Sequence, residues 1–151
     1  MIGYGSRVAG SGGEFRTAVM PMLSVRGAPA AIEFYKRAFG ATELNRLTAP
    51  DGGVVAELAV EGARFYLADE SPDHQNFSPD SLGGSTVRIE LFVEDPDAVA
   101  AQAVAAGGTE VIPVADQPYG LRQGRVRDPF GHHWLIGRPL DGSDWGRPAG
   151  G

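Results

Sequence analysis

The stretches GATEL at residues 40–44 and GGTEV at residues 107–111 are near-copies of each other. Each follows an alanine-rich run, and each run follows a short apolar stretch that reaches a valine, Val25 or Val93. Superposing the two valines and the first glycine of each pentapeptide requires one gap. We therefore predict that the chain is a diverged duplication of one structural module.

Both halves show the same order of predicted elements: strand, helix and three strands. Residues 28–40 place apolar side chains on one helical face, and Gly40 supplies a stop. In the second half Asp95 suits a helix cap, with Pro96 at the first helical position and the helix continuing through 98–107. Alternation predicts strands near 17–25, 41–47, 53–60 and 63–69, and again near 86–93, 108–114, 122–128 and 132–137.

Composition sets the expected domain organisation. Residues 1–16 and 139–151 are rich in small and polar residues, which is typical of flexible tails, and Trp145 is interpreted as an anchor for the second tail. We expect a single domain in which module one covers 17–69, a polar linker loop covers 70–85 and module two covers 86–138.

The overall composition excludes several classes of function. The chain has 151 residues, a net charge of −6 and no cysteine, so disulfides, thiolate metal sites and cysteine nucleophiles are ruled out. Acidic and basic residues are interspersed, which argues against nucleic acid as a partner. No run approaches the ~20 apolar residues that span a bilayer, so we expect a soluble cytoplasmic protein with no membrane partner.

Three motifs accompany the repeat: AIEFYKRAFGATEL at 31–44, FVEDPDAV at 92–99 and GRVRDPFGHHWLI at 124–136. Together they resemble the vicinal oxygen chelate superfamily of glyoxalases, bleomycin-resistance proteins and extradiol dioxygenases, and most closely its PhnB-like branch. The resemblance covers roughly residues 18–138. It implies an α+β fold in which two tandem βαβββ modules form curled mixed sheets around a cup-shaped cavity for a small molecule.

Strand alternation predicts which side chains face this cup. In residues 86–93 the core side is expected to hold Val87, Ile89, Leu91 and Val93, and the cup side Thr86, Arg88, Glu90 and Phe92. The same parity assigns to the cup Met20, Met22, Ser24, Arg64, Tyr66, Ala68, His133 and Leu135. It assigns to the core His132, Trp134 and Ile136.

The resemblance also indicates where metal ligands would stand. Metal enzymes of the superfamily carry His, Gln or Glu at one cup position on the first and last strands of each module, and those positions here are Met20, Tyr66, Arg88 and Leu135. None of these side chains suits a divalent ion. We expect no metal and no cofactor. A replacement set of Glu57, Glu90 and His133 is conceivable but matches no known ligand spacing.

The candidate catalytic residues are His133 and Glu90, which could transfer a proton if they meet in the cup. Arg88 could hold an anionic ligand, or it could simply pair with Glu90. The candidate ligand-binding residues are Met20, Met22, Tyr66, Arg88, Phe92, Tyr119 and Leu135. His132 is expected to bond backbone in the core, and His74 to lie in solvent.

Residues 122–131, RQGRVRDPFG, are interpreted as an edge strand with solvated charges at Arg125 and Arg127, followed by a structural turn that begins at Asp128. No glycine-rich stretch has the spacing of a phosphate-binding loop.

The favoured hypothesis is a metal-independent small-molecule-binding protein that acts as a homodimer and sequesters or carries an apolar or aromatic ligand. The alternative is an enzyme on the same scaffold, a lyase, isomerase or dioxygenase, that uses His133 and Glu90 or an unrecognised metal site. A third possibility is a protein whose cup is filled and whose role is assembly.

Overall fold

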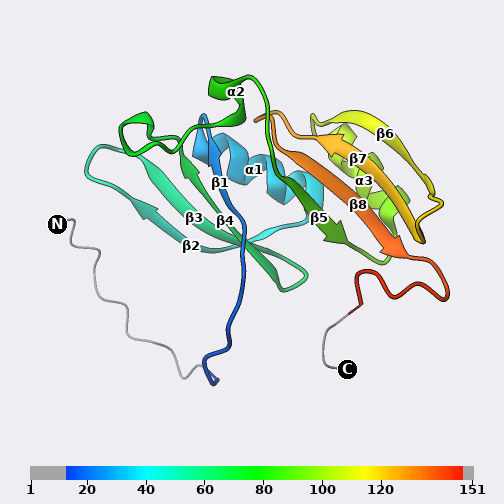
Figure 1. The fold of residues 1–151 in the computed structure, drawn as a ribbon. Helices are drawn as coiled ribbons and strands as arrows, with labels where there is room; N and C mark the ends of the chain where they lie inside the picture. Colours follow the sequence, from blue (N-terminus) through cyan, green and yellow to red (C-terminus); the bar gives the residue numbers. More distant parts are fainter. Residues whose placement is uncertain (1–12, 148–151) are drawn as a thin grey trace.

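A computed structural model describes residues 13–147 (Figure 1). Residues 1–12 and 148–151 of the two predicted tails lie outside the described residues. The first module contains β1 Met22–Val25, α1 Ala28–Phe39, β2 Thr42–Thr48, β3 Val54–Val60 and β4 Ala63–Asp69. A linker with the 3-10 turn η1 Pro72–His74 and the short helix α2 Pro79–Leu82 leads to the second module, which contains β5 Arg88–Phe92, α3 Pro96–Ala105, β6 Thr109–Asp116, β7 Leu121–Arg127 and β8 His133–Pro139.

The two modules form two four-stranded mixed sheets of matching topology. Their strand orders are β1-β4-β3-β2 and β5-β8-β7-β6. In each sheet the first strand of the module runs parallel to the last, and the remaining neighbours are antiparallel. The predicted α+β fold of two tandem βαβββ modules is confirmed.

The helices begin and end for local reasons that the sequence shows. Gly40 ends α1 in the left-handed region, with φ of 67°, and its N–H bonds the last carbonyls of the helix. The Asp95 side chain accepts a hydrogen bond from the backbone N–H of Ala98 at 3.1 Å, so the predicted cap of α3 is confirmed.

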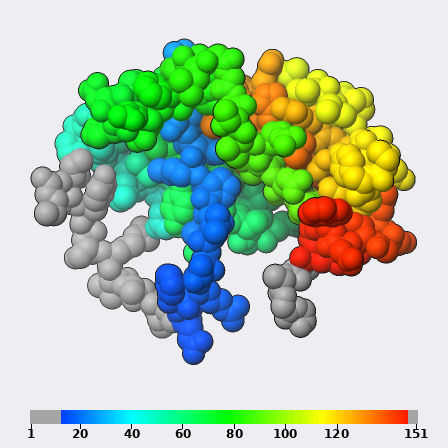
Figure 2. Space-filling model, viewed as in Figure 1, coloured from blue at the N-terminus to red at the C-terminus, as the bar shows by residue number. Residues whose placement is uncertain are grey.

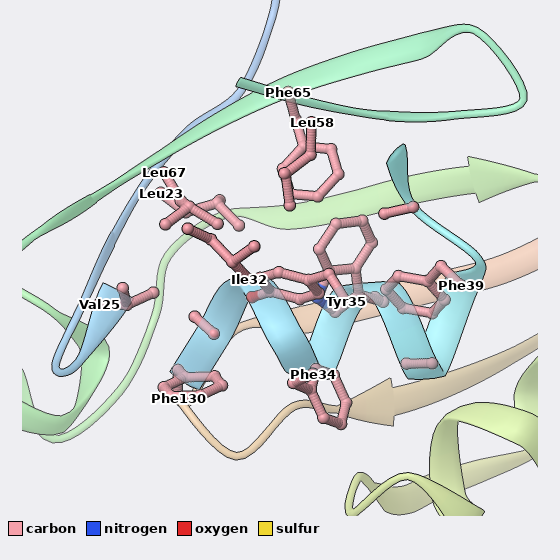
Figure 3. Close-up of a cluster of buried hydrophobic side chains, with 14 of the residues drawn as sticks. Leu23, Val25, Ile32, Phe34, Tyr35, Phe39, Leu58, Phe65, Leu67 and Phe130 are labelled. Atoms are coloured by element: carbon pink, nitrogen blue, oxygen red, sulfur yellow. The ribbon is translucent and has the colours of Figure 1, made fainter. Parts of the chain in front are cut away.

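The core forms around α1, which has apolar side chains on two sides. Figure 3 shows Leu23, Leu67 and Phe65 of the first sheet on one side of the helix. It shows Phe130, from the second module, near Phe34 on the other. Each fully buried side chain of this size contributes about 1.5–3 kcal/mol, so this cluster fixes the two modules to each other. The opposite face of each sheet is left for other contacts.

Asp128 joins the modules through hydrogen bonds. Its carboxylate accepts from the Tyr35 hydroxyl of α1 and from Trp134 Nε1 at 2.9 Å. It also accepts from the backbone N–H groups of Phe130 and His132. Asp128 is only 3% exposed, and four donors compensate for burying its charge. The predicted structural turn therefore also links the two halves.

The first strand is shorter than the alternation predicts. It begins at Met22 rather than near residue 17, and residues 13–21 form an extended segment without strand pairing. Pro21 explains the boundary, because it accepts a bond from Tyr66 N but has no N–H to continue the ladder. Figure 2 shows this segment, in blue, projecting from the body of the molecule.

Two further predictions about the second module are wrong. Val87 was expected in the core, but β5 begins only at Arg88, and Val87 is 66% exposed. The strand predicted near residues 122–128 was expected at a sheet edge, but the observed strand β7 lies between β8 and β6. The repeat explains this position, since β7 corresponds to β3, which is also internal. Within residues 13–147, no helix is long and apolar enough to cross a membrane.

Candidate functional site

The face of each sheet turned away from the core carries the predicted cup residues. Register pairs Met22 with Tyr66 in the first sheet, and Arg88 with His133 in the second. Side chains on one face recur at every second residue, so Glu90 and its partner Leu135 share a face with Arg88. The parity prediction is confirmed for β5, where Ile89 and Leu91 are buried while Arg88 and Glu90 are exposed.

In the first sheet, polar contacts of this face centre on Glu57. Glu57 is 7% exposed, and its carboxylate accepts a hydrogen bond from Asn45 Nδ2 at 2.6 Å and lies 3.7 Å from Arg64 Nη1. A hydrogen bond to Glu57 raises the pKa of Tyr66, with burial as a smaller cause. Asn45 Oδ1 is buried without a partner among the described residues. From the sequence, Glu57 was expected only as a possible metal ligand, and the strand pattern gave no sign of this hydrogen-bond network.

In the second sheet, Glu90 and His133 have separate partners. Glu90 Oε1 lies 3.4 Å from Gln123 Nε2, and Gln123 in turn accepts from the Tyr119 hydroxyl at 2.7 Å. His133 Nδ1 accepts from Arg125 Nε at 2.9 Å. The described structure shows neither a Glu90–His133 hydrogen bond nor an Arg88–Glu90 ion pair within 4.0 Å, so the expected pairings are not formed.

The Arg125 contact determines the state of His133. Burial is the main cause that lowers the pKa of this imidazole, and the charges of Arg125 and Arg127 lower it further. A guanidinium can only donate, so Nδ1 must offer its lone pair and the ring proton resides on Nε2. His133 therefore presents an N–H donor and lacks the free lone pair that a general base requires.

Two neighbouring cavities lie beside α2 and share Pro79, Gly83 and Gly84. One, of about 560 Å³, is lined by Arg127 and His133 from the second sheet. The other, of about 680 Å³, is more apolar and lies between β1 and β5, where its lining includes Met22, Ser24, Phe77, Leu82 and Val87. Both volumes fall in the range of small-ligand pockets.

The remaining ligand-binding candidates lie away from these two cavities. Tyr66, Phe92 and Leu135 are half-buried on the cup face, and Met20 lies in the extended segment before β1. Tyr119 lines an open hollow of about 570 Å³ beside the C-terminal segment. The structure thus brings Met22 to one cavity, His133 to another and Tyr119 to a third hollow.

Trp145 does not anchor the C-terminal segment, because its side chain is 69% exposed. The segment contacts the rest of the domain at two other points. Gly146 lies so close to the Phe92 ring that a Cβ there would meet it at 2.7 Å, and the backbone N–H of Leu140 donates to the carbonyl oxygen of Gly120. A glycine allows the chain to pass this close to an aromatic ring. The segment therefore covers part of Phe92 at the end of β5.

The other two histidines have structural surroundings. His132 is 9% exposed, and its Nε2 lies 2.9 Å from the backbone oxygen of Ser24 in the first module, which confirms its expected core role. His74 is exposed, as predicted, and its Nδ1 contacts Ser71 Oγ at 2.7 Å.

The positions that the resemblance assigns to metal ligands are occupied by groups that do not fit a divalent ion. Leu135 offers no donor, Arg88 is permanently cationic, and Tyr66 is kept neutral by the raised pKa of its hydroxyl. Across the described residues 13–147, no group of three or more His, Asp or Glu side chains is placed to hold a metal ion.

Comparison with known families identifies the class of the protein. The model of the Glyoxalase/Bleomycin resistance protein/Dioxygenase superfamily matches residues 17–136. The chain therefore belongs to this superfamily, in agreement with the duplicated βαβββ topology.

Individual relatives extend this result. An uncharacterized protein of Mycobacterium tuberculosis is 44% identical over 127 residues, which cover 82% of this chain and 75% of that protein. The X-ray structure of an Arabidopsis thaliana gene product is 34% identical with a TM-score of 0.63 and covers 80% of this chain and 98% of its own. TnmS3, an antibiotic binding protein from a Streptomyces species, shares the fold at 22% identity and a TM-score of 0.63, with 83% of this chain and 99% of TnmS3 covered.

Proposed function

We propose that this protein binds a small apolar or aromatic molecule on the cup faces of its sheets, without a metal ion at the superfamily's ligand positions. The single observation that carries the proposal is the placement of Met22, Tyr66, Phe92 and Leu135. All four lie on strands, opposite the core, and keep part of their surface exposed. Partly exposed apolar and aromatic side chains beside a few fixed polar groups are typical of small-ligand sites.

The polar groups favour binding over proton transfer. Glu90 contacts Gln123, and His133, whose pKa is lowered mainly by burial, accepts from Arg125 and carries its proton on Nε2, so the two candidate catalytic residues do not form an acid–base pair. The enzymatic alternative predicts that His133→Ala and Glu90→Gln each abolish turnover of a hemithioacetal or a catechol. The binding proposal predicts no turnover of either compound by the unaltered protein.

Two finer assignments belong to the same proposal. We place the chain in the PhnB-like branch on the motifs at 31–44 and 124–136, and in the cytoplasm because it contains no cysteine. The antibiotic-binding neighbour TnmS3 supports only the point that this fold can serve in binding.

We also propose that the protein acts as a homodimer in which a second copy completes the binding site. Residues 13–21 extend away from their own module, and Phe15 and Val19 are 93% and 97% exposed. Leu82 and Val87, each 66% exposed, line the apolar cavity between β1 and β5. Covering such surfaces with another chain removes apolar area from water.

The binding proposal can be tested with 2-naphthol, a neutral aromatic probe, by fluorescence titration of the full chain. We expect Tyr66→Ala to weaken binding roughly tenfold, because an aromatic contact and its buried area are lost. Val104→Ala is the matched control, since Val104 lies on α3, on the helix side of the second sheet, and is 40% exposed. Equal affinity in all three proteins would contradict a cup-face site.

A further inference from the structure

Basic side chains cluster on the cup face of the second sheet. Arg88, His133 and Arg127 are register partners across β5, β8 and β7, so they stand side by side in one row. Arg125 lies on the same face, two residues before Arg127, and contacts His133. We propose that this basic row, Arg88, Arg125, Arg127 and His133, binds the carboxylate or phosphate group of a small-molecule ligand. This inference rests on the proposed function and adds the charge of the ligand to it.

The arginines of the basic row lack carboxylate partners. Within residues 13–147, none of the three forms an ion pair within 4.0 Å. Arg46 and Arg122 show the contrast, because each pairs with a carboxylate, at 2.9 Å and 2.7 Å. Arg125 and Arg127 lie on one face of β7, and Arg88 lies two strands away on β5, so an anion bound over β8 could accept hydrogen bonds from both sides.

Among the residues that the structure describes, the carboxylates near the basic row form no ion pairs with its arginines. Asp128 already accepts four hydrogen bonds and lies in the core, and Glu90 is directed to Gln123. Asp80, on α2, lines the same cavity as Arg127 and His133 but forms no ion pair with the row. Three guanidinium groups that make no contact with a carboxylate in the described part of the chain remain available to an anionic ligand.

The side chains of the basic row offer hydrogen-bond donors and no free acceptor. Guanidinium groups only donate, and the Arg125 contact occupies the one acceptor of the His133 ring, which leaves Nε2–H. The lowered pKa of His133 agrees with this neutral, donating state. A row of side chains that offers several N–H groups matches the oxygens of a carboxylate or phosphate.

The space beside the basic row is large enough for such a ligand. Arg127 and His133 line the cavity of about 560 Å³ that adjoins the more apolar cavity of about 680 Å³. Neighbouring strands are spaced about 4.8 Å apart, so Arg88 and Arg127 stand roughly 10 Å apart at the backbone and can approach one anion from two sides. The ligand's apolar part would then lie toward the neighbouring apolar cavity.

Titrations with three matched compounds test this inference: 2-naphthol, 2-naphthoate and 2-naphthyl phosphate. We expect both anions to bind at least about tenfold more tightly than 2-naphthol, because charge-assisted hydrogen bonds are added. The tighter of the two anions identifies whether a carboxylate or a phosphate fits. Added salt should weaken the anions and leave 2-naphthol nearly unchanged.

Single substitutions then locate the anion. Arg127→Gln and Arg88→Gln should each weaken 2-naphthyl phosphate by about tenfold with little effect on 2-naphthol. Arg37→Gln is the matched control, since Arg37 is exposed on α1, away from the cup faces. Asp80→Asn should tighten anion binding, because it removes a negative charge from the same cavity. In NMR titrations, 2-naphthyl phosphate should raise the pKa of His133.

The possible outcomes separate this inference from the proposed function. If 2-naphthol binds as tightly as the anions and the arginine substitutions change nothing, the anion site is wrong while the binding function stands. If none of the three compounds binds, both proposals are overturned. An effect of Arg37→Gln equal to that of Arg127→Gln would assign the preference for anions to net charge rather than to the basic row.

Discussion

At the scale of single residues, Asp128 shows how one side chain can hold two duplicated halves together. It follows β7, yet two of its donors, the Tyr35 hydroxyl and Trp134 Nε1, come from α1 and β8. Burial is the main reason that the pKa of Tyr35 is raised, and the Asp128 charge adds to it. The phenol therefore stays protonated and donates, which is the state that a buried carboxylate requires.

Asp128→Asn should destabilise the protein strongly. The amide keeps one acceptor oxygen, but its NH₂ group would face donors, which leaves buried N–H or O–H groups unpaired. We expect the free energy of unfolding to fall by about 2–4 kcal/mol, measured by urea denaturation. Asp51→Asn, at an exposed turn, should change it by less than about 1 kcal/mol. A loss at Asp128 no larger than at Asp51 would contradict the structural role.

At the scale of elements, α2 is held over the cavities by Glu70. The carboxylate accepts from Arg26 Nε at 2.8 Å, from Ser78 N at 3.0 Å and from Ser81 Oγ at 2.7 Å. These donors, with the Ser78 backbone N–H contributing most, lower the pKa of Glu70 from 4.5 to about 2. The position of α2 thus depends on one ionised group.

This dependence predicts a pH response. A lowered folded-state pKa means that Glu70 stabilises the docked linker fully above about pH 4.5, and that this contribution is lost as the pH falls toward 2. Glu70→Gln should lower the hydrogen-exchange protection of the Ser78 amide at pH 7, and the difference from the unaltered protein should shrink below pH 4.5. Equal protection in both proteins at pH 7 would refute the role of Glu70.

The helices and strands also show which structural features the sequence pattern could predict and which it could not. Helices α1 and α3 and the internal strands were predictable because their periodicity matches their packing. The start of β1 was not predictable, because the alternation of side chains continues to the N-terminal side of Pro21 while the hydrogen-bonded strand pairing begins only at Met22. Alternation placed Arg88, Glu90 and His133 on one face, but it could not show that His133 contacts Arg125 and Glu90 contacts Gln123, because such contacts depend on rotamers and neighbouring strands.

At the scale of the whole molecule, one chain leaves the cup faces of both sheets partly open. The core binds the modules through α1, Phe130 and Trp134 on their other faces. In the view of Figure 2, the described N-terminal segment, in blue, projects away from the rest of the molecule, and the C-terminal segment, in red, lies at one end of the second sheet. A second copy is the partner that would cover these surfaces symmetrically.

The proposed homodimer makes a direct prediction for the full chain. Sedimentation velocity should give twice the 15.9 kDa mass of one chain. Val19→Asp should shift the protein toward the monomer, because a charge on a surface covered by the partner is costly to desolvate. Glu14→Gln, in the same exposed segment, is the matched control and should leave the dimer intact. Circular dichroism should be unchanged in both variants, since Val19 is 97% exposed and contributes little to the fold of its own chain. A monomeric unaltered protein, or a dimer indifferent to Val19→Asp, would exclude this segment from the interface.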